Sequence, residues 1–321
     1  MNGVRTAIVV LCACVVQAAL AAELYPARPV RVVIPFPPGG GSDVLGRRVV
    51  QKLSESMGQQ FVVDNRAGAN GIIGTELVTR SRPDGYTLLV GSTAMSSNAT
   101  LYTKLPYDTL KSLAPISPFA NMPYFVATSA ALPVNSVKEL IGYVKANPGK
   151  VNFGSSGVGG TPHLTGEMFN TAAGIKMVHV PYKGIAEVLV DLMSGQVQVI
   201  FTGLAGLGPH VRTGKVRMLA IADAKRSALM PELPTISESG VPGFEAASWF
   251  GLFGPAGVPK SVQERLASEI AKAAQTKGLQ EQFVPAGAEP LASTPEQFAA
   301  SFRQDVIKWA KVVKESGARA D

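Results

Sequence analysis

The sequence has very little cysteine: Cys12 and Cys14 are its only two, and both lie near the N-terminus. The rest of the chain can therefore form no disulfide and no thiolate metal site. After residue 21 the chain also lacks any apolar run long enough to predict a membrane span. Its stability must come from hydrophobic cores, and a chain of 321 residues can bury sizeable ones without cross-links.

Dense runs of basic residues are absent as well. The chain carries 30 Lys and Arg against 23 Asp and Glu, a formal charge of +7. No segment predicts a basic helix face with interleaved aromatic residues, so nucleic-acid binding is poorly supported. A mild positive balance helps to attract anionic ligands, although it would equally serve solubility.

Motifs of common enzymes and metal sites are missing too. No G-x-S-x-G is present, since Gly154–Val158 (GSSGV) fails at its last position, and there is no G-x-G-x-x-G, P-loop or H-E-x-x-H. Among the histidines only His163 has a partner at a metal-like spacing, Glu167. We predict no catalysis, no cofactor and no metal. A periplasmic hydrolase that uses Ser155 or Ser156 is a disfavoured alternative, because neither serine has an evident base.

The N-terminal segment predicts export. Arg5 precedes the uncharged run Ala7–Ala21, which ends in the small-x-small sequence expected before a signal-peptidase site. The run is short for a membrane span, which takes about 20 residues. We therefore expect a signal peptide over residues 1–21, cleavage near Ala21 or Ala22, and a periplasmic monomer. An uncleaved anchor and a lipid on Cys14 remain open.

The following segments alternate between strand-like and helix-like patterns. Short β-branched runs predict strands at 30–35, 61–63 and 86–91, separated by helices at 44–57 and 75–80, an order typical of a doubly wound parallel sheet. The pattern then restarts. Strands are predicted at 124–128, 151–154, 178–180, 197–201 and 216–221, and helices at 137–146, at 164–171 and in a segment ending at 193.

The last part of the chain is too small for a third domain. It predicts a strand at 249–255, a helix at 262–274, and a final helix that starts at Thr294, with Pro295 first and Gln297 completing a capping box. Ser136 and Glu139 form a similar box before the helix at 137–146. We expect one lobe from residues 22–124 and 246–321, and a second from 125–245.

Three strand-to-helix turns are candidates for a ligand site: Pro38–Asp43, Ser155–His163 and Tyr182–Gly184. Ligands of doubly wound folds bind at the carboxyl ends of the strands. Turns there that are rich in glycine expose N–H groups at the positive end of a helix, and these suit a carboxylate. Glycine in any single turn is explained by the turn itself, but repetition in both lobes favours a site.

The stretch Pro35–Asp43 (PFPPGGGSD) resembles the Bug receptors, the extracytoplasmic solute receptors of tripartite tricarboxylate transporters. Further similar stretches follow in order, from about Tyr25 onwards: 25–30 (YPARPV), 64–71 (DNRAGANG), 83–87 (PDGYT), 181–184 (PYKG), 231–235 (PELPT) and 249–251 (WFG). The resemblance implies a two-lobed α/β periplasmic-binding-protein (Venus-flytrap) fold, each lobe a doubly wound sheet with flanking helices.

By the same resemblance, the lobes would close on a small carboxylate and pass it to membrane transporter subunits, which are separate proteins. A ligand-sensing input for a membrane kinase would share the fold and remains an alternative. The site residues that we predict from the turns and from the resemblance are Pro38, Gly39, Gly40, Gly41, Ser42, Asp43, Ser92, Ser155, Ser156, Gly160, Thr161, His163, Tyr182, Lys183, Ile185 and Thr202.

Individual roles follow from chemistry at these positions. We expect the N–H groups of Gly40 and Gly41 to face the ligand, while Ser42 and Asp43 shape the turn, because a second carboxylate would repel an anion. Thr161 and His163 would donate from the second lobe. Two residues depart from the family pattern. Thr202 stands where relatives that bind acidic amino acids often have Asp, which argues against an amino-acid ligand. Ile185 is bulky where a small residue is usual, which favours an apolar or aromatic ligand body.

Overall fold

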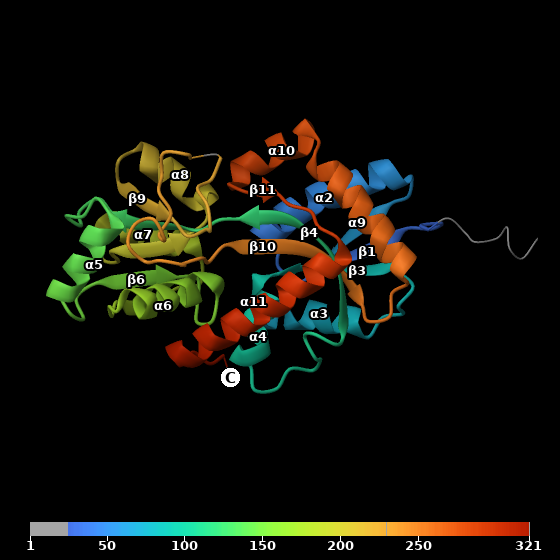
Figure 1. Cartoon of the computed structure of the whole chain (residues 1–321), viewed down its shortest axis with the longest axis horizontal. Coiled ribbons are helices and arrows are strands. Elements are labelled where there is room, and N and C mark those ends of the chain that lie inside the picture. The colour runs from blue at the N-terminus through green and yellow to red at the C-terminus, as the bar shows by residue number, and fades with distance from the viewer. Residues whose placement is uncertain (1–24, 229, 321) are drawn as a thin grey trace, which may run out of the picture.

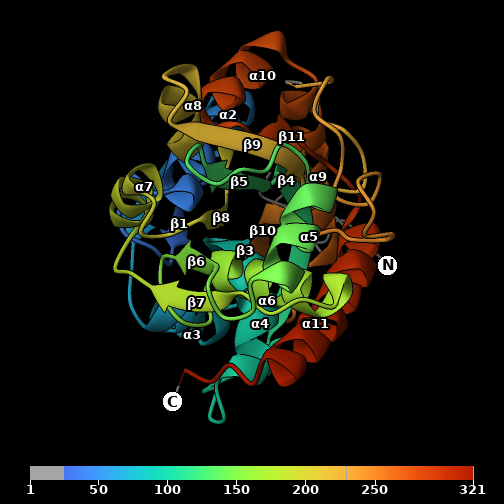
Figure 2. The same cartoon turned by 90° about the vertical axis from the view of Figure 1, so that its left-hand side faces the viewer.

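The computed structural model describes residues 25–228 and 230–320 (Figure 1). The expected signal peptide, with Cys12, Cys14 and the cleavage point near Ala21 or Ala22, lies outside the described residues. The described chain forms two lobes side by side, each a sheet covered by helices on both faces (Figures 1 and 2). No helix within 25–228 or 230–320 is both long and apolar enough to cross a membrane.

The first lobe contains a six-stranded sheet in the order β11-β4-β10-β3-β1-β2. Its strands are β1 (Val30–Ile34), β2 (Phe61–Asn65), β3 (Thr87–Ser92), β4 (Leu113–Met122), β10 (Ser248–Pro255) and β11 (Glu289–Pro290). Its helices are α2 (Gly41–Met57), α3 (Ile72–Thr79), α4 (Thr93–Leu101), α9 (Lys260–Ala274), α10 (Lys277–Phe283) and α11 (Pro295–Ser316), with the short turns η1 (Ala69–Gly71) and η2 (Val284–Ala286).

The second lobe contains a five-stranded sheet in the order β7-β6-β8-β5-β9. Its strands are β5 (Phe125–Ser129), β6 (Asn152–Ser155), β7 (Val178–Pro181), β8 (Val199–Thr202) and β9 (Val216–Ile221). Its helices are α5 (Val137–Ala146), α6 (Thr161–Ala173), α7 (Ile185–Ser194) and α8 (Leu204–Arg212). This is the two-lobed α/β fold expected from the sequence.

The three strands from which a parallel sheet was predicted are parallel, but strands that join the sheet later in the chain run the other way. Strands β1, β2 and β3 are parallel, but β10 is antiparallel to both β3 and β4. The reason is the chain path: β4 leads out of the first lobe and β10 leads back into it, so the two run in opposite directions (Figure 1). Likewise, β5 is antiparallel to β8 and β9, because it enters the second lobe along the same crossing.

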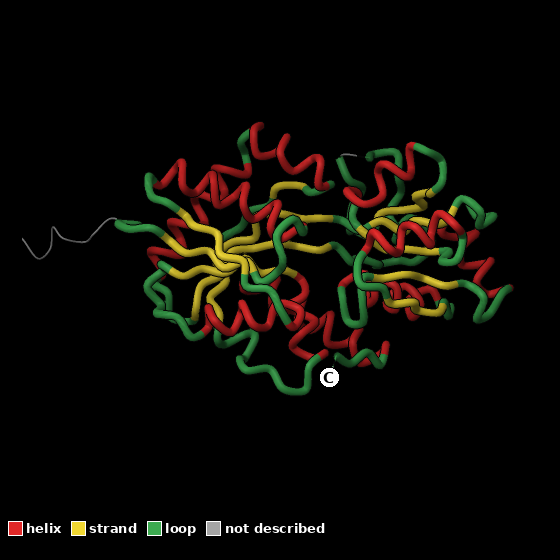
Figure 3. Tube along the Cα trace, turned by 180° about the vertical axis from the view of Figure 1, so that it is seen from behind, coloured by secondary structure: helices red, strands yellow, loops and turns green. Residues whose placement is uncertain are grey.

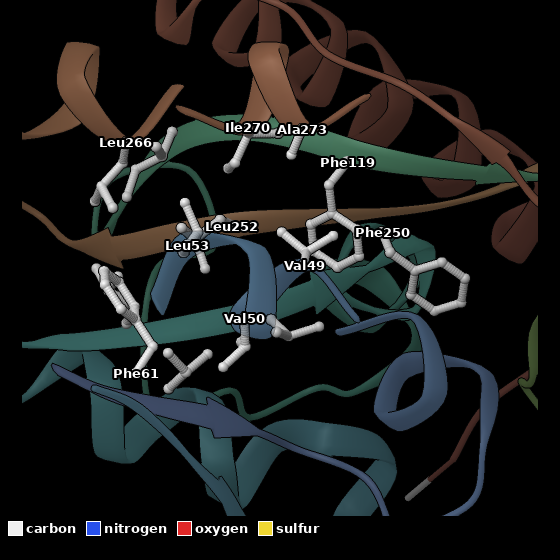
Figure 4. Close-up of a cluster of buried hydrophobic side chains, with 14 of the residues drawn as sticks. Val49, Val50, Leu53, Phe61, Phe119, Phe250, Leu252, Leu266, Ile270 and Ala273 are labelled. Atoms are coloured by element: carbon white, nitrogen blue, oxygen red, sulfur yellow. The ribbon is translucent and has the colours of Figure 1, made fainter. Parts of the chain in front are cut away.

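The apolar stripes read from the sequence form the core of the first lobe. Val49 and Leu53 of α2 point toward Phe119 and Leu252 of the sheet, and Ile270 of α9 covers them (Figure 4). All five side chains are buried. Burying a side chain of this size contributes about 1.5–3 kcal/mol, so such clusters supply the stability that disulfides would otherwise give.

The final helix begins as the sequence predicts, and it also reaches the other lobe. Thr294 and Gln297 make the reciprocal capping box, with Pro295 in the first turn. Further along, the buried side chain of Trp309 packs with Leu164 of α6 in the second lobe. The C-terminal helix therefore joins the lobes as well as covering the first sheet (Figure 1). The view from behind shows the same two lobes, each with its strands lying between helices (Figure 3).

Candidate ligand site

Five strands lead almost directly into helices: β1 into α2, β3 into α4, β6 into α6, β7 into α7 and β8 into α8. The residues at the N-caps of these helices make no side-chain hydrogen bond to the helix; they are Gly40, Ser92, Gly160, Gly184 and Gly203. By contrast, α5, α10 and α11 are each capped by a hydroxyl, from Ser136, Thr276 and Thr294. The first N–H groups of the five helices are therefore left without a side-chain acceptor.

The backbone does not require glycine at these caps. Gly40 has φ −76°, Gly160 −65° and Gly203 −72°, and Gly184 is extended. Any residue adopts such angles, and Ser, Asp or Asn there would cap the helix. A Cβ atom on Gly40 would meet nothing closer than the Pro37 carbonyl at 3.8 Å. Glycine at this cap leaves open space at the positive end of the helix, which is where anions bind. Gly203 differs, because a Cβ there would lie 3.3 Å from Met122 Sδ.

Helix starts from the two lobes meet at Met122, the last residue of β4. A Cβ on Gly41, at the start of α2, would lie 3.8 Å from the Met122 Sδ and Cε atoms and 3.4 Å from Phe250 Cζ. A Cβ on Gly203, at the start of α8, would lie 3.3 Å from Met122 Sδ. Met122 is partly exposed and packs against the cores of both lobes. One side chain therefore separates two uncapped helix starts.

The turn before α2 is held by Asp43, which is 4% exposed. Its carboxylate accepts hydrogen bonds from Gly39 N at 3.0 Å, Arg47 Nε at 2.9 Å and Asn65 Nδ2 at 2.9 Å. Burial alone would raise the pKa of Asp43, but the hydrogen bonds from Arg47, Gly39 and Asn65 outweigh it and keep that pKa below its usual value. The negative charge of Asp43 is therefore paired within the turn, whereas Gly40 and Gly41 are exposed to solvent.

The buried side chain of His163 stabilises the turn before α6. His163 is buried, and its Nδ1 accepts a hydrogen bond from Gly159 N at 3.0 Å. Its ring stacks on His179 with centroids 3.8 Å apart, and burial lowers the pKa of both histidines to about 4. We expected His163 to donate to a ligand; its ring instead supports the turn beneath the exposed Ser156.

Ser155 has a base that the sequence did not reveal. Its Oγ lies 2.6 Å from His179 Nε2, and also contacts the backbone of Gly157. A nucleophile must reach its substrate, but Ser155 has no exposed surface. The pair therefore fixes the turn, and its placement gives the hydrolase alternative no support.

The hydroxyl of Tyr124 links α6 to the two segments where the chain passes between the lobes, one between β4 and β5 and one at the start of β10. Tyr124 lies between β4 and β5, and its buried hydroxyl interacts with the side chains of Thr161 and Ser248. Burial raises the pKa of Tyr124 to about 12, so the phenol is neutral at physiological pH. Sequence reasoning missed both Tyr124 and Met122 as site residues, because their importance depends on where the chain crosses between lobes.

The remaining predicted residues surround these helix starts. Ser92 and Thr202 are buried at the ends of β3 and β8. Tyr182 donates its hydroxyl to Asp191 at 2.7 Å, while Lys183 is exposed in the same turn and Ile185 is half-buried at the start of α7. No group of three or more His, Cys, Asp or Glu side chains suited to a metal ion occurs in the part of the chain that the structure describes.

Known relatives cover almost the whole chain. A family model described as the tripartite tricarboxylate transporter family receptor matches residues 45–318. Protein BugT of Bordetella pertussis is 37% identical over 306 residues, which are 95% of this chain and 94% of that protein. A UPF0065 protein from the tcbD-tcbE intergenic region of a Pseudomonas species is 36% identical over 294 residues, covering 91% and 88%.

Solved structures of similar proteins have the same two-lobed fold. A protein of R. palustris solved with adipate has a TM-score of 0.80 and 35% identity, and the match covers 92% of this chain and 99% of that one. The periplasmic binding protein BugD has a TM-score of 0.77 and 34% identity, with 92% and 100% covered. MatC of Rhodopseudomonas palustris, solved with malate, has a TM-score of 0.74 and 28% identity, with 90% and 100% covered.

Proposed function

The chain belongs to the tripartite tricarboxylate transporter receptor family, and we propose that it captures a small carboxylate between its lobes and delivers it to a membrane transporter. The observation that carries this proposal is the meeting of uncapped helix starts from both lobes at Met122. N–H groups at helix starts stabilise a bound anion without a charged side chain. A ligand that contacts both lobes would also favour the closed arrangement, which a membrane partner could recognise.

The ligand of the proposal is a small organic acid. Two related proteins were solved with adipate and with malate, which are both dicarboxylates. In this chain the buried Thr202 offers a hydroxyl and no negative charge, so it cannot pair with an ammonium group. We therefore propose a carboxylate without an amino group.

Within this site, the N–H groups of Gly40 and Gly41 would bind one carboxylate of the ligand from the first lobe. In the second lobe, the N–H groups at the start of α8, after Gly203, would bind the other carboxylate, together with those of Gly160 and Thr161 at the start of α6. Asp43 and His163 would position the two turns without touching the ligand, which agrees with their hydrogen bonds to Gly39 and Gly159. Lys183, exposed beside α7, would add a positive charge near the bound anion.

A panel of mono- and dicarboxylates tests this function by thermal denaturation of the mature protein. A ligand that binds only the folded state adds about 2.7 kcal/mol of stability at a concentration of about 100 times its dissociation constant. We expect at least one dicarboxylate to raise the melting temperature, and sugars and amines to leave it unchanged. Stabilisation by sugars or amines alone would show that the ligand class is wrong.

We further propose that the protein reaches the periplasm and loses residues 1–21 on the way. The support is the charged start and small-x-small end of this segment. The intact mass of the protein purified from the periplasm should correspond to a chain that begins at Ala22 or Glu23. A mass that includes the first 21 residues, or a lipid on Cys14, would contradict cleavage at this point.

A further inference from the structure

The side chains between the start of α2 (Gly41) and the start of α8 (Gly203) are apolar. Met122 contributes its thioether, and Phe250 presents its Cζ edge to Gly41. Phe250 is only 4% exposed and lies at the edge of the main hydrophobic cluster, where it stacks on Phe119 with centroids 6.5 Å apart (Figure 4). The position of the aromatic ring is thus set by the core of the first lobe.

The neighbouring polar residue on β4, Asn121, adds no polar group to the apolar surface of Met122 and Phe250. Asn121 donates its side-chain amide to Asp223 at 2.7 Å, so the amide is bound to the second lobe behind the crossing. Successive residues of a strand point to opposite faces, and Asn121 and Met122 therefore present different chemistry to the two sides. On the side of Gly41 and Gly203, the thioether is at most a weak hydrogen-bond acceptor.

We propose that Met122 and Phe250 select ligands with an unsubstituted carbon chain against hydroxylated ligands of the same length and charge. This inference rests on the proposed function, because it assumes that the carboxylates are held at the helix starts on either side of Met122. The chain that joins them then lies on the partly exposed thioether of Met122, with the buried ring of Phe250 behind it. A hydroxyl group there loses water and gains no comparable partner, which weakens binding.

Calorimetric titration with matched pairs of dicarboxylates tests the selection. The pairs are succinate with malate, glutarate with 2-hydroxyglutarate, and adipate with 3-hydroxyadipate. In each pair that binds, we expect the unsubstituted acid to bind about 10- to 100-fold more tightly, the usual range for one buried, unpaired hydroxyl. This comparison uses the unaltered mature protein and so does not depend on how any variant folds.

Two variants assign the selection to Met122. Met122→Gln keeps the length of the side chain and adds a donor and an acceptor, so we expect the ratio within each pair to fall below about 3-fold. Met122→Leu remains apolar and should keep the preference for the unsubstituted acid. A wild-type preference for the hydroxylated acids, or an unchanged ratio in Met122→Gln, would overturn the inference. Failure of every carboxylate to bind would instead contradict the proposed function itself.

Discussion

Replacing Gly40 with asparagine should abolish tight carboxylate binding while the fold remains intact. The φ of −76° at this N-cap suits asparagine, and no atom outside its chain neighbours lies closer than 3.8 Å to the position of the new Cβ. The amide side chain would fill the open space at the start of α2 and accept the N–H group of Ser42, so a carboxylate could no longer reach the N–H groups of Gly40 and Gly41. Losing two hydrogen bonds to a charged group, each worth about 1.5–3 kcal/mol, weakens binding at least about 100-fold.

Thr276→Asn is the matched control, because it places the same residue at the N-cap of α10, a helix whose cap is already a hydroxyl. Titration calorimetry and thermal melts of both variants should give normal melting temperatures, with binding lost only in Gly40→Asn. Asparagine is at least as good an N-cap as glycine, so a lowered melting temperature is not expected. Normal affinity in a folded Gly40→Asn protein would show that this helix start does not hold the ligand.

The stability of the protein should fall as the pH is lowered from about 6.5 to 4. Both stacked histidines are neutral in the folded protein, since burial lowers their pKa to about 4, whereas an unfolded histidine titrates near 6.5. Between these values the unfolded chain binds more protons, so acid favours unfolding. The stabilisation is complete above about pH 6.5 and is lost toward pH 4.

The slope for His163 alone approaches about 1.4 kcal/mol per pH unit within this window. His179 adds less, because it is partly exposed and its charge is better solvated. Glu167 opposes the trend: its Oε1 lies 3.8 Å from His163 Nε2, and its pKa is raised by burial, although Asn170 and Lys176 counteract this. Other carboxylates in unfolded chains titrate near pH 4, so the histidines dominate the middle of the window.

Urea unfolding at several pH values between 4.5 and 7 measures this slope. The double variant His163→Gln and His179→Gln removes both titrating rings, and its stability should depend on pH much less. The comparison is informative even if the variant is less stable throughout, because only the slope is compared. An equal slope in the variant would show that other groups control acid stability.

The regular helices and their buried stripes could be predicted from the sequence, because each rests on local periodicity or capping. The stripe of α2, with Leu45, Val49 and Leu53, is buried as expected, and so is that of α9. The box of Ser136 and Glu139 formed only in part: Ser136 caps α5, but the Glu139 carboxylate accepts from Asn135 N.

The sequence did not predict elements whose own residues disfavour a strand or a helix. Strand β4 contains Pro115 and Pro118, which normally argue against an interior strand. It nevertheless pairs with β10, through two shifts in register that accommodate the irregular backbone. Helix α8 contains two glycines and a proline, which disfavour a helix although Leu204, Leu207 and Val211 lie on one face. Helix α4 consists mostly of small and polar residues, with Met95 and Leu101 as its large apolar side chains. Only the tertiary packing stabilises these three elements.

The candidate site was predicted in part for the same reason. The glycine turns are visible in the sequence, because composition and the switch from strand to helix mark them. The position of Met122 depends on β4, which was not predicted. The contact between Ser155 and His179 joins residues on two different strands, and no spacing along the chain reveals it.

The central claim is that open N–H groups at the helix starts hold the ligand, and amide resonances of glycine test it directly. In protein labelled with ¹⁵N-glycine, variants of single glycines identify the signals of Gly40, Gly41 and Gly58 among the 33 glycines. At saturation with a dicarboxylate that binds, we predict large downfield shifts for Gly40 and Gly41. Gly58, at the other end of the same helix, should stay in place. Saturated binding with Gly40 and Gly41 unshifted would contradict the account.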